Sequence, residues 1–392
     1  MTSSENSKTF FKTFLEALIA YSFDFGGVLA GVFVVYYFNI FQSYPWAVAV
    51  YPAILSARGM ISGLFSGRLG TALHLGIVYP KFLGNTKSFC VLFNSVIVIT
   101  LETSIVMSGF SMIFGIFFWG VPSNAFFEMF AIVVSTMTFG LILSFFTMSV
   151  GFTTFQKGLD PDVIGYPIMS TVADIFITLC YIFTLGLYAL SKYMVVLVAI
   201  FHICLSLYLM LKDFKKEEFV KTIKESLATL IIVAFIVNVT GTVLKQIRFR
   251  KEIYSAYPAL IDTVGDVGSV VGSTATTKLA LGLLNPSFSA MREHSKQIFA
   301  AWAASVIMFL SFSALSLYIN DIYSISAFLN FSILLLTTNL FAVSVMILIS
   351  YAVAILTFKK GLDPDNFVIP IESSIADSIT TIALFAAIFL IG

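Results

Sequence analysis

Charged residues are scarce in this sequence. Of its 392 residues, 11% are charged and 59% are hydrophobic, whereas about a quarter of the residues of a soluble domain are charged. The apolar residues form long runs, and a helix needs about 20 of them to cross a bilayer. The composition therefore argues against a soluble protein. It predicts an all-α, polytopic transmembrane helical bundle whose main partner is the lipid bilayer.

Cysteine, histidine and clustered basic residues are also few. Cys90, Cys180 and Cys204 lie inside apolar runs and form no CxxC pair, which argues against disulfides and against a thiolate metal site. The three histidines lie far apart in the sequence, so a zinc site is not expected. No basic tract is long enough to indicate binding of nucleic acid.

The apolar runs predict about 11 membrane spans and an orientation for them. With a cytoplasmic N-terminus, the inner loops hold 14 lysines and arginines and the outer loops hold five. This bias follows the positive-inside rule and predicts a multi-pass protein of the cell membrane with an extracellular C-terminus. The runs are 14–38, 45–79, 89–119, 124–152, 164–190, 193–211, 226–244, 256–284, 297–319, 327–357 and 367–391.

An internal repeat is the strongest pattern in the sequence. The segment Gly158-Leu159-Asp160-Pro161-Asp162 returns as Gly361-Leu362-Asp363-Pro364-Asp365, which is 203 residues later. The segment Tyr51-Pro52-Ala53 returns as Tyr257-Pro258-Ala259, which is 206 residues later. Two blocks in the same order at nearly equal offsets indicate a duplicated unit.

The repeat predicts the domain organisation. We expect a first five-helix repeat at 1–190, a linking transmembrane helix and cytoplasmic linker at 191–224, and a second five-helix repeat at 225–392. Since five is odd, the extra span restores the orientation of the second repeat. The two repeats should then be parallel, one of the two arrangements known for duplicated transporters.

Several acidic residues fall inside predicted spans, where an ionisable side chain costs at least about 2.5–3.5 kcal/mol and usually lines a cavity or binds something. Asp174 and Asp377 are repeat equivalents. In parallel repeats they would face each other across the symmetry axis if they point towards it. Asp262 and Asp266 lie four residues apart, on one face of a helix. Further acids, without an acidic repeat counterpart, are Asp24, Glu102 and Glu372.

The sparse acidic set indicates a metal site for a hydrated ion. Mg2+ keeps most of its water and binds one or two carboxylates, whereas Ca2+ prefers six to eight oxygen ligands. The predicted metal residues are Asp174, Asp377, Asp266 and Asp262, and the secondary candidates are Ser170, Thr171, Ser373, Ser374, Asp162 and Asp365.

Each candidate also has a structural interpretation. Asp174 and Asp377 could serve only to join helices by hydrogen bonds, and Asp162 and Asp365 could cap the helices that follow them. Arg68 and Lys278 fit salt bridges or side chains that extend to the interface.

These motifs resemble the membrane domain of the MgtE magnesium transporters and of solute carrier family 41. That pattern has a proline followed by Gly-Asn in the second helix, and Asp-Pro, a proline and an intramembrane aspartate in the fifth. The matching residues are Pro258 with Gly265-Asp266, Pro52 with Gly59-Met60, Asp363-Pro364 with Pro370 and Asp377, and Asp160-Pro161 with Pro167 and Asp174. Asp266 and Met60 depart from the pattern, since the family has asparagine there.

The resemblance implies a pathway for Mg2+, as transported ion, along the second and fifth helices of each repeat. Because proteins of that family pair two separate subunits, it also implies that this chain is an internal pseudo-dimer, which can act as a monomer. The sequence thus predicts a transporter of divalent cations and not an enzyme, and leaves three alternatives. One is a Na+-coupled carrier or one of broader cation specificity. Another is an intramembrane aspartyl protease, although Thr263-Val264-Gly265-Asp266 lacks the first glycine of its Gly-x-Gly-Asp motif. The third is a structural or receptor role without transport.

Overall fold

The computed structural model of this chain is helical throughout the part that it describes. It describes residues 3–157, 161–360 and 364–391, without the side chains of 3–9, 161–170, 228, 280 and 364–373. These residues form helices and no strand. The all-α fold is confirmed.

The helices form two compact units. Unit 1 comprises Met1–Val35 and Gln246–Gly392, and unit 2 comprises Tyr36–Lys245. The boundary therefore assigns the first helical segment of the chain to the unit that holds the C-terminal half.

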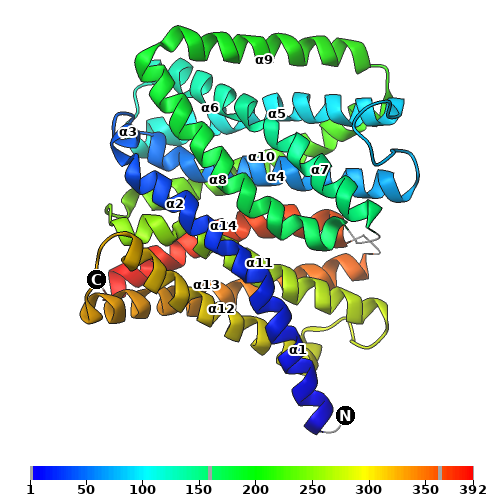
Figure 1. The fold of residues 1–392 in the computed structure, drawn as a ribbon, viewed down its shortest axis with the longest axis vertical. Coiled ribbons are helices and arrows are strands. Elements are labelled where there is room, and N and C mark those ends of the chain that lie inside the picture. Colours follow the sequence, from blue (N-terminus) through cyan, green and yellow to red (C-terminus); the bar gives the residue numbers. More distant parts are fainter. Residues whose placement is uncertain (1–2, 158–160, 361–363, 392) are drawn as a thin grey trace. The chain divides into compact units, whose positions relative to one another are not determined.

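In unit 2, α4 packs against α5, α7 and α8, while α6 packs against α5, α8 and α9. The elements of unit 2 (Figure 1) are α3 (Phe38–Gln42), α4 (Ala47–His74), α5 (Lys87–Phe114), η2 (Gly115–Trp119), η3 (Ser123–Ala125), α6 (Phe126–Gly140), α7 (Ile142–Gln156), α8 (Pro161–Leu190), α9 (Lys192–Asp213) and α10 (Glu217–Gln246).

In unit 1, α11 is the central helix, because it packs against α1, α12, α13 and α14. The elements of unit 1 are α1 (Ser3–Tyr21), η1 (Ser22–Asp24), α2 (Phe25–Tyr36), α11 (Lys251–Ala280), η4 (Phe288–Ala290), α12 (Met291–Ile319), α13 (Ile325–Lys359) and α14 (Pro364–Ile391).

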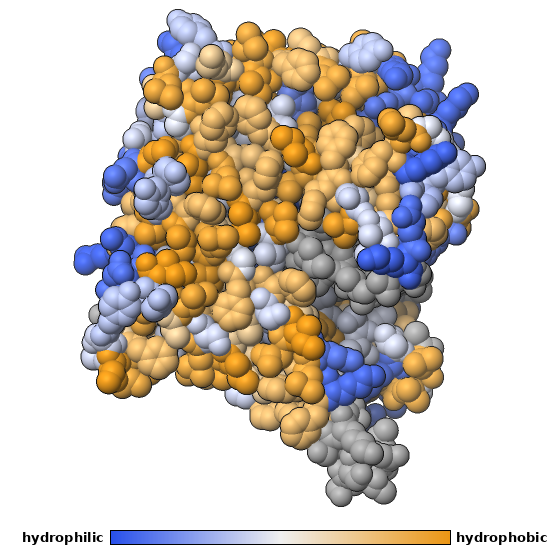
Figure 2. Space-filling model, viewed as in Figure 1, coloured by the Kyte–Doolittle hydropathy of each residue, from blue (hydrophilic) through white to orange (hydrophobic). Residues whose placement is uncertain are grey.

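Ten helices of the described part are long and apolar enough to cross a membrane. The chain is therefore a multi-pass membrane protein. Figure 2 shows apolar residues over the middle of the visible face of unit 2, with hydrophilic residues at its two edges. The eleventh expected span, α11, is not among the ten, since its glycine, serine, threonine and aspartate residues make it more polar. Four helices surround α11, so it does not need an apolar surface towards lipid.

The two copies of the duplicated segment fold alike. The contacts of α4 with α5, α7 and α8 in unit 2 correspond to those of α11 with α12, α13 and α14 in unit 1. Both α4 and α11 contain a proline, Pro52 and Pro258. Both are followed by a left-handed glycine, Gly76 and Gly282, each with φ of 68°. Glycine is favoured at such helix ends because it adopts positive φ without strain.

The first helix of each repeat packs in the unit that holds the body of the other repeat. A Cβ atom on Gly31 of α2 would contact the carbonyl oxygen of Ser255 in α11, within unit 1. A Cβ atom on Gly241 of α10 would contact the carbonyl oxygen of Ala49 in α4, within unit 2. Ala49 and Ser255 are 206 residues apart, the offset of the repeat. The two crossings are therefore equivalent, and the repeats have exchanged their first helices.

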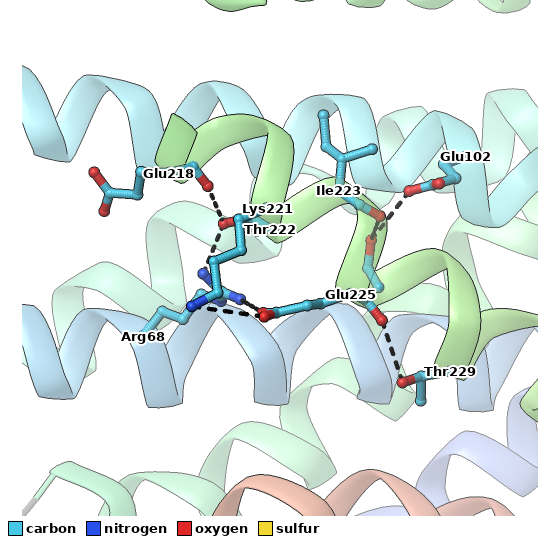
Figure 3. A network of polar contacts seen from close by, with 9 residues as sticks. Arg68, Glu102, Glu218, Lys221, Thr222, Ile223, Glu225 and Thr229 are labelled. Atoms are coloured by element: carbon cyan, nitrogen blue, oxygen red, sulfur yellow. Dashed lines mark hydrogen bonds and ion pairs between the residues drawn. The ribbon is translucent and has the colours of Figure 1, made fainter. Parts of the chain in front are cut away.

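Polar contacts hold α10 in unit 2 (Figure 3). Arg68 of α4 donates to Thr222 Oγ1 at 2.6 Å and pairs with Glu225 at 2.9 Å. Ser226 donates to the carboxylate of Glu102 on α5 at 3.1 Å. The ion pair confirms the interpretation of Arg68 as a salt-bridged residue. These contacts fasten α10 to the first repeat near one of its ends, since they involve its first ten residues.

Candidate functional site

Each unit has one hydrogen bond between two helices of the site, and the two bonds are equivalent in the repeat. Tyr51 of α4 and Thr178 of α8 join their hydroxyls at 2.9 Å in unit 2. Tyr257 of α11 and Thr381 of α14 join theirs at 2.8 Å in unit 1. The tyrosines are separated by 206 residues and the threonines by 203, as in the sequence repeat. The second and fifth helices of each repeat are thus joined at the same level.

The predicted central acids lie one helical turn before these threonines. Asp174 is 6% exposed in unit 2, and Asp377 is 7% exposed in unit 1. Thr381 donates to the carbonyl oxygen of Asp377 at 2.6 Å. The buried hydroxyls of Thr171 and Ser374 occupy equivalent positions three residues before each acid. Each repeat therefore has a hydroxyl, a carboxylate and a hydroxyl on one face of its fifth helix, at spacings of three and four residues.

Four of the secondary candidates lie outside the described side chains: Ser170, Ser373, Asp162 and Asp365. The helices that contain them begin at Pro161 and Pro364. Proline is favoured at the first helical position, because its missing N–H is not needed there. The Asp-Pro motif thus marks the start of the fifth helix in both repeats.

The other two predicted metal residues, Asp262 and Asp266, lie on α11 in unit 1. Asp266 has a buried oxygen, Oδ2, without a hydrogen-bond partner in the described part of the chain. A Cβ atom on Gly265 would lie 3.6 Å from Cβ of Ala376. Asp266 directly follows Gly265 in the chain, and Asp377 directly follows Ala376. The small side chains of Gly265 and Ala376 thus bring α11 and α14 together at the level of both acids.

Unit 2 has a buried arginine where unit 1 is apolar. Arg58 of α4 is 1% exposed, and its Nη2 donates a hydrogen bond to Ser144 Oγ at 3.5 Å. Gly140 provides room for it, because a Cβ atom there would lie 3.8 Å from Arg58 Cδ and 2.8 Å from Ile177 Cδ1. The repeat counterparts of Arg58, Gly140 and Ser144 are Val264, Val343 and Ile347. Three positions thus differ together, and the arginine environment belongs to one repeat.

The described residues contain no group of three or more His, Cys, Asp or Glu side chains that could hold a metal ion.

One acid contact in unit 1 was only partly predictable. The sequence drew attention to Asp24 as an acid within a span. The structure joins its Oδ2 to Thr263 Oγ1 of α11 at 2.5 Å. The hydroxyl of Tyr21 lies close enough to Asp24 and Asp266 to interact electrostatically with both carboxylates. No sequence pattern indicated Thr263 or Tyr21, because both are ordinary residues within apolar helices.

Comparison with known proteins identifies the duplicated segment. A family model described as "MgtE: Divalent cation transporter" matches residues 51–184 and again 257–387. Searches of curated proteins and of solved structures each found no match. The two matched regions cover most of the chain and each contains one pair of second and fifth helices.

Proposed function

The chain belongs to the MgtE divalent cation transporter family, and from this premise we propose that it transports Mg2+ with Asp174 and Asp377 as the acids of the pathway. The buried carboxylate at the same position of both repeats carries this proposal. An intramembrane acid costs at least about 2.5–3.5 kcal/mol on insertion scales and usually lines a cavity or binds something. Its retention in both copies favours a role in moving the cation.

Mg2+ is favoured over other divalent ions by the ligands around these acids. In each fifth helix the central aspartate has a hydroxyl one turn to either side, and the second helix adds the tyrosine that bonds to the later hydroxyl. These groups can hydrogen-bond to the water of a hydrated ion. Ca2+ would need more direct oxygen ligands than they provide.

The proposal includes the finer expectations from the sequence. Both acids are taken to act on one pathway between the repeats, with Asp262 and Asp266 as further acids along it. The N-terminus is taken to be cytoplasmic and the C-terminus extracellular. The protein is taken to work as an internal pseudo-dimer, as a transporter and not as an enzyme, with Mg2+ as its cargo.

The test is Mg2+ flux into liposomes that contain the purified protein and an internal Mg2+-sensitive dye. Asp174→Asn and Asp377→Asn should each lower flux at least about tenfold, which corresponds to about 1.4 kcal/mol at the rate-limiting barrier. Asp321→Asn is the matched control. It removes an acid from an exposed loop where φ is 59°, a conformation that asparagine also tolerates.

Wild-type flux in both single variants would refute the role of the acids. If they act on one pathway, the double variant should fall by less than the product of the two single effects. Independent, multiplying effects would contradict a shared pathway. Repeating the assay with and without a Na+ gradient separates the Na+-coupled alternative from uncoupled Mg2+ transport, and Mn2+, Co2+ and Ca2+ in place of Mg2+ measure specificity.

A further inference from the structure

A group of oxygen atoms in unit 1 joins the N-terminal helices to α11. We propose that Tyr21, Asp24, Thr263 and Asp266 form a second cation site, for an alkali or alkaline-earth ion, within unit 1 alone. The inference relies on the proposed function only for the choice of cations to test, because a binding measurement detects the site without transport.

The position of Asp24 is fixed by its partner on α11. Asp24 is 3% exposed, and its Oδ2 accepts a hydrogen bond from Thr263 Oγ1 at 2.5 Å. A short hydrogen bond to one carboxylate oxygen restricts the orientation of the carboxylate. Thr263 lies three residues before Asp266, on the same side of the helix. The bond thus fixes the Asp24 carboxylate to the part of α11 that carries Asp266.

Two buried oxygen atoms near this bond have no hydrogen-bond partner among the described residues. They are the hydroxyl of Tyr21, a residue that is 0% exposed, and Oδ2 of Asp266. The Tyr21 hydroxyl interacts electrostatically with Asp24 and Asp266. A buried polar atom without a partner costs about 1–3 kcal/mol, and more if it is charged. Two such atoms in side chains that interact electrostatically indicate that something else satisfies both.

The chemistry of the group selects a hard cation. It provides two carboxylates and two hydroxyls, so every ligand is an oxygen atom, as Na+ and Mg2+ prefer. Two acids are fewer than the three that a closed metal cluster would need, which agrees with the absence of such a cluster among the described residues. The ion would keep part of its water, and the repulsion between the two carboxylates would be reduced while it is bound.

The site belongs to unit 1 only. Since Gly31 and Gly241 are equivalent, Ile231 and Ala234 of α10 occupy the positions of Tyr21 and Asp24. By the repeat offset of 206, Ala57 and Met60 of α4 occupy the positions of Thr263 and Asp266. All four ligands of the proposed site are thus replaced by apolar residues in unit 2. Ion binding at this site can therefore be removed without changing unit 2.

The test measures thermal stabilisation of the full chain in detergent by MgCl2 and, separately, by NaCl, with choline chloride to keep the ionic strength constant. An ion that binds only the folded state stabilises it by RT ln(1 + c/Kd) at ion concentration c, so the unfolding temperature rises with ion concentration in a way that reports Kd. Asp24→Asn and Asp266→Asn should each raise the apparent Kd of one cation at least about tenfold, since each removes one of two charged ligands. The salt that loses its effect identifies the ion.

Tyr21→Phe keeps the proposal testable if the aspartate variants do not fold. It removes one oxygen that has no hydrogen-bond partner, so without cations its unfolding temperature should equal or exceed that of wild type. With the bound cation its gain should be smaller, because the apparent Kd rises by about tenfold. Tyr36→Phe, on a side chain that is 77% exposed, should match wild type in both conditions.

Two results would overturn the inference. In one, Tyr21→Phe, Asp24→Asn and Asp266→Asn all retain the wild-type cation dependence. In the other, their unfolding temperatures depend on pH but on neither cation, which would show that the two carboxylates share a proton and do not bind a cation. Failure of the proposed function is a separate result: Asp377→Asn would then keep wild-type Mg2+ flux while cation binding still depended on Asp24.

Discussion

The exchange of first helices predicts opposite effects for the same substitution at different glycines. Inside a helix, Gly→Ala is normally stabilising by about 0.5–1 kcal/mol. At Gly241 the new Cβ atom would contact the carbonyl oxygen of Ala49 and lie 2.8 Å from its carbonyl carbon. These are backbone atoms of α4, so no side chain can rotate away and the two helices must separate. Overpacking of this kind costs about 1–3 kcal/mol.

Gly241→Ala should therefore lower the unfolding temperature by roughly 2–12 °C, taking about 2–4 °C per kcal/mol for a unit of some 200 residues. The repeat-equivalent Gly31→Ala should lower it similarly, because its Cβ atom would contact the carbonyl oxygens of Tyr254 and Ser255.

The matched control for both is Gly109→Ala in α5, where a Cβ atom has no neighbour within 4 Å. It should leave the unfolding temperature unchanged or raise it. The measurement is tryptophan fluorescence of the detergent-solubilised protein on heating. If Gly31→Ala and Gly241→Ala are tolerated as well as Gly109→Ala, the close crossings of α2 with α11 and of α10 with α4 are wrong.

Three further predictions concern single contacts. Arg58→Met should leave the unfolding temperature unchanged or raise it, because a buried charge with poor hydrogen bonding is replaced by an apolar side chain of similar length. The same variant should lower the Mg2+ concentration that gives half-maximal flux. Unchanged flux kinetics would contradict this second expectation. Tyr51→Phe and Tyr257→Phe should each cost about 1 kcal/mol and give similar shifts in unfolding temperature, whereas clearly unequal shifts would contradict the equivalence of the two hydrogen bonds. Arg68→Ala should cost only about 0.2–1 kcal/mol, since its pair with Glu225 is partly exposed, and the loss should shrink in 1 M NaCl because salt screens such pairs; a loss that does not depend on salt would argue against the ion pair.

The helices and their duplication could be predicted from the sequence because both depend on local patterns. Apolar runs give the positions of spans, and repeated blocks give their equivalence. The bonds of Tyr51 with Thr178 and of Tyr257 with Thr381 extend that equivalence to side-chain contacts. The family match confirms the resemblance that rested on the Asp-Pro and intramembrane aspartate motifs.

The exchange of first helices could not be predicted in the same way. Hydropathy gives the length of α2 and α10 but not their partners, since any apolar helix can pack against any other in a bilayer. What selects the partner is the close approach of Gly31 and Gly241 to backbone carbonyls on α11 and α4. Small residues permit such approaches, but neither glycine lies in a repeated block. Similarly, Asp24 was recognisable as an acid within a span, while its bond to Thr263 joins residues 239 positions apart.

The differences between the two repeats follow from their fusion in one chain. A symmetric pair of identical subunits must place every residue twice, so a buried charge in one half also appears in the other. A fused chain is free of that constraint. Arg58 with Gly140 in unit 2 and Asp24 with Asp266 in unit 1 are two such changes. Each required neighbouring residues to change with it, and such coordinated differences are expected when the two halves acquire different roles on the same scaffold. Introducing one of these charges alone into the other repeat should therefore destabilise the protein more than introducing it together with its neighbours. Val264→Arg alone would place a guanidinium between Val343 and Ile347. Changing Val264, Val343 and Ile347 together to arginine, glycine and serine restores the environment found around Arg58.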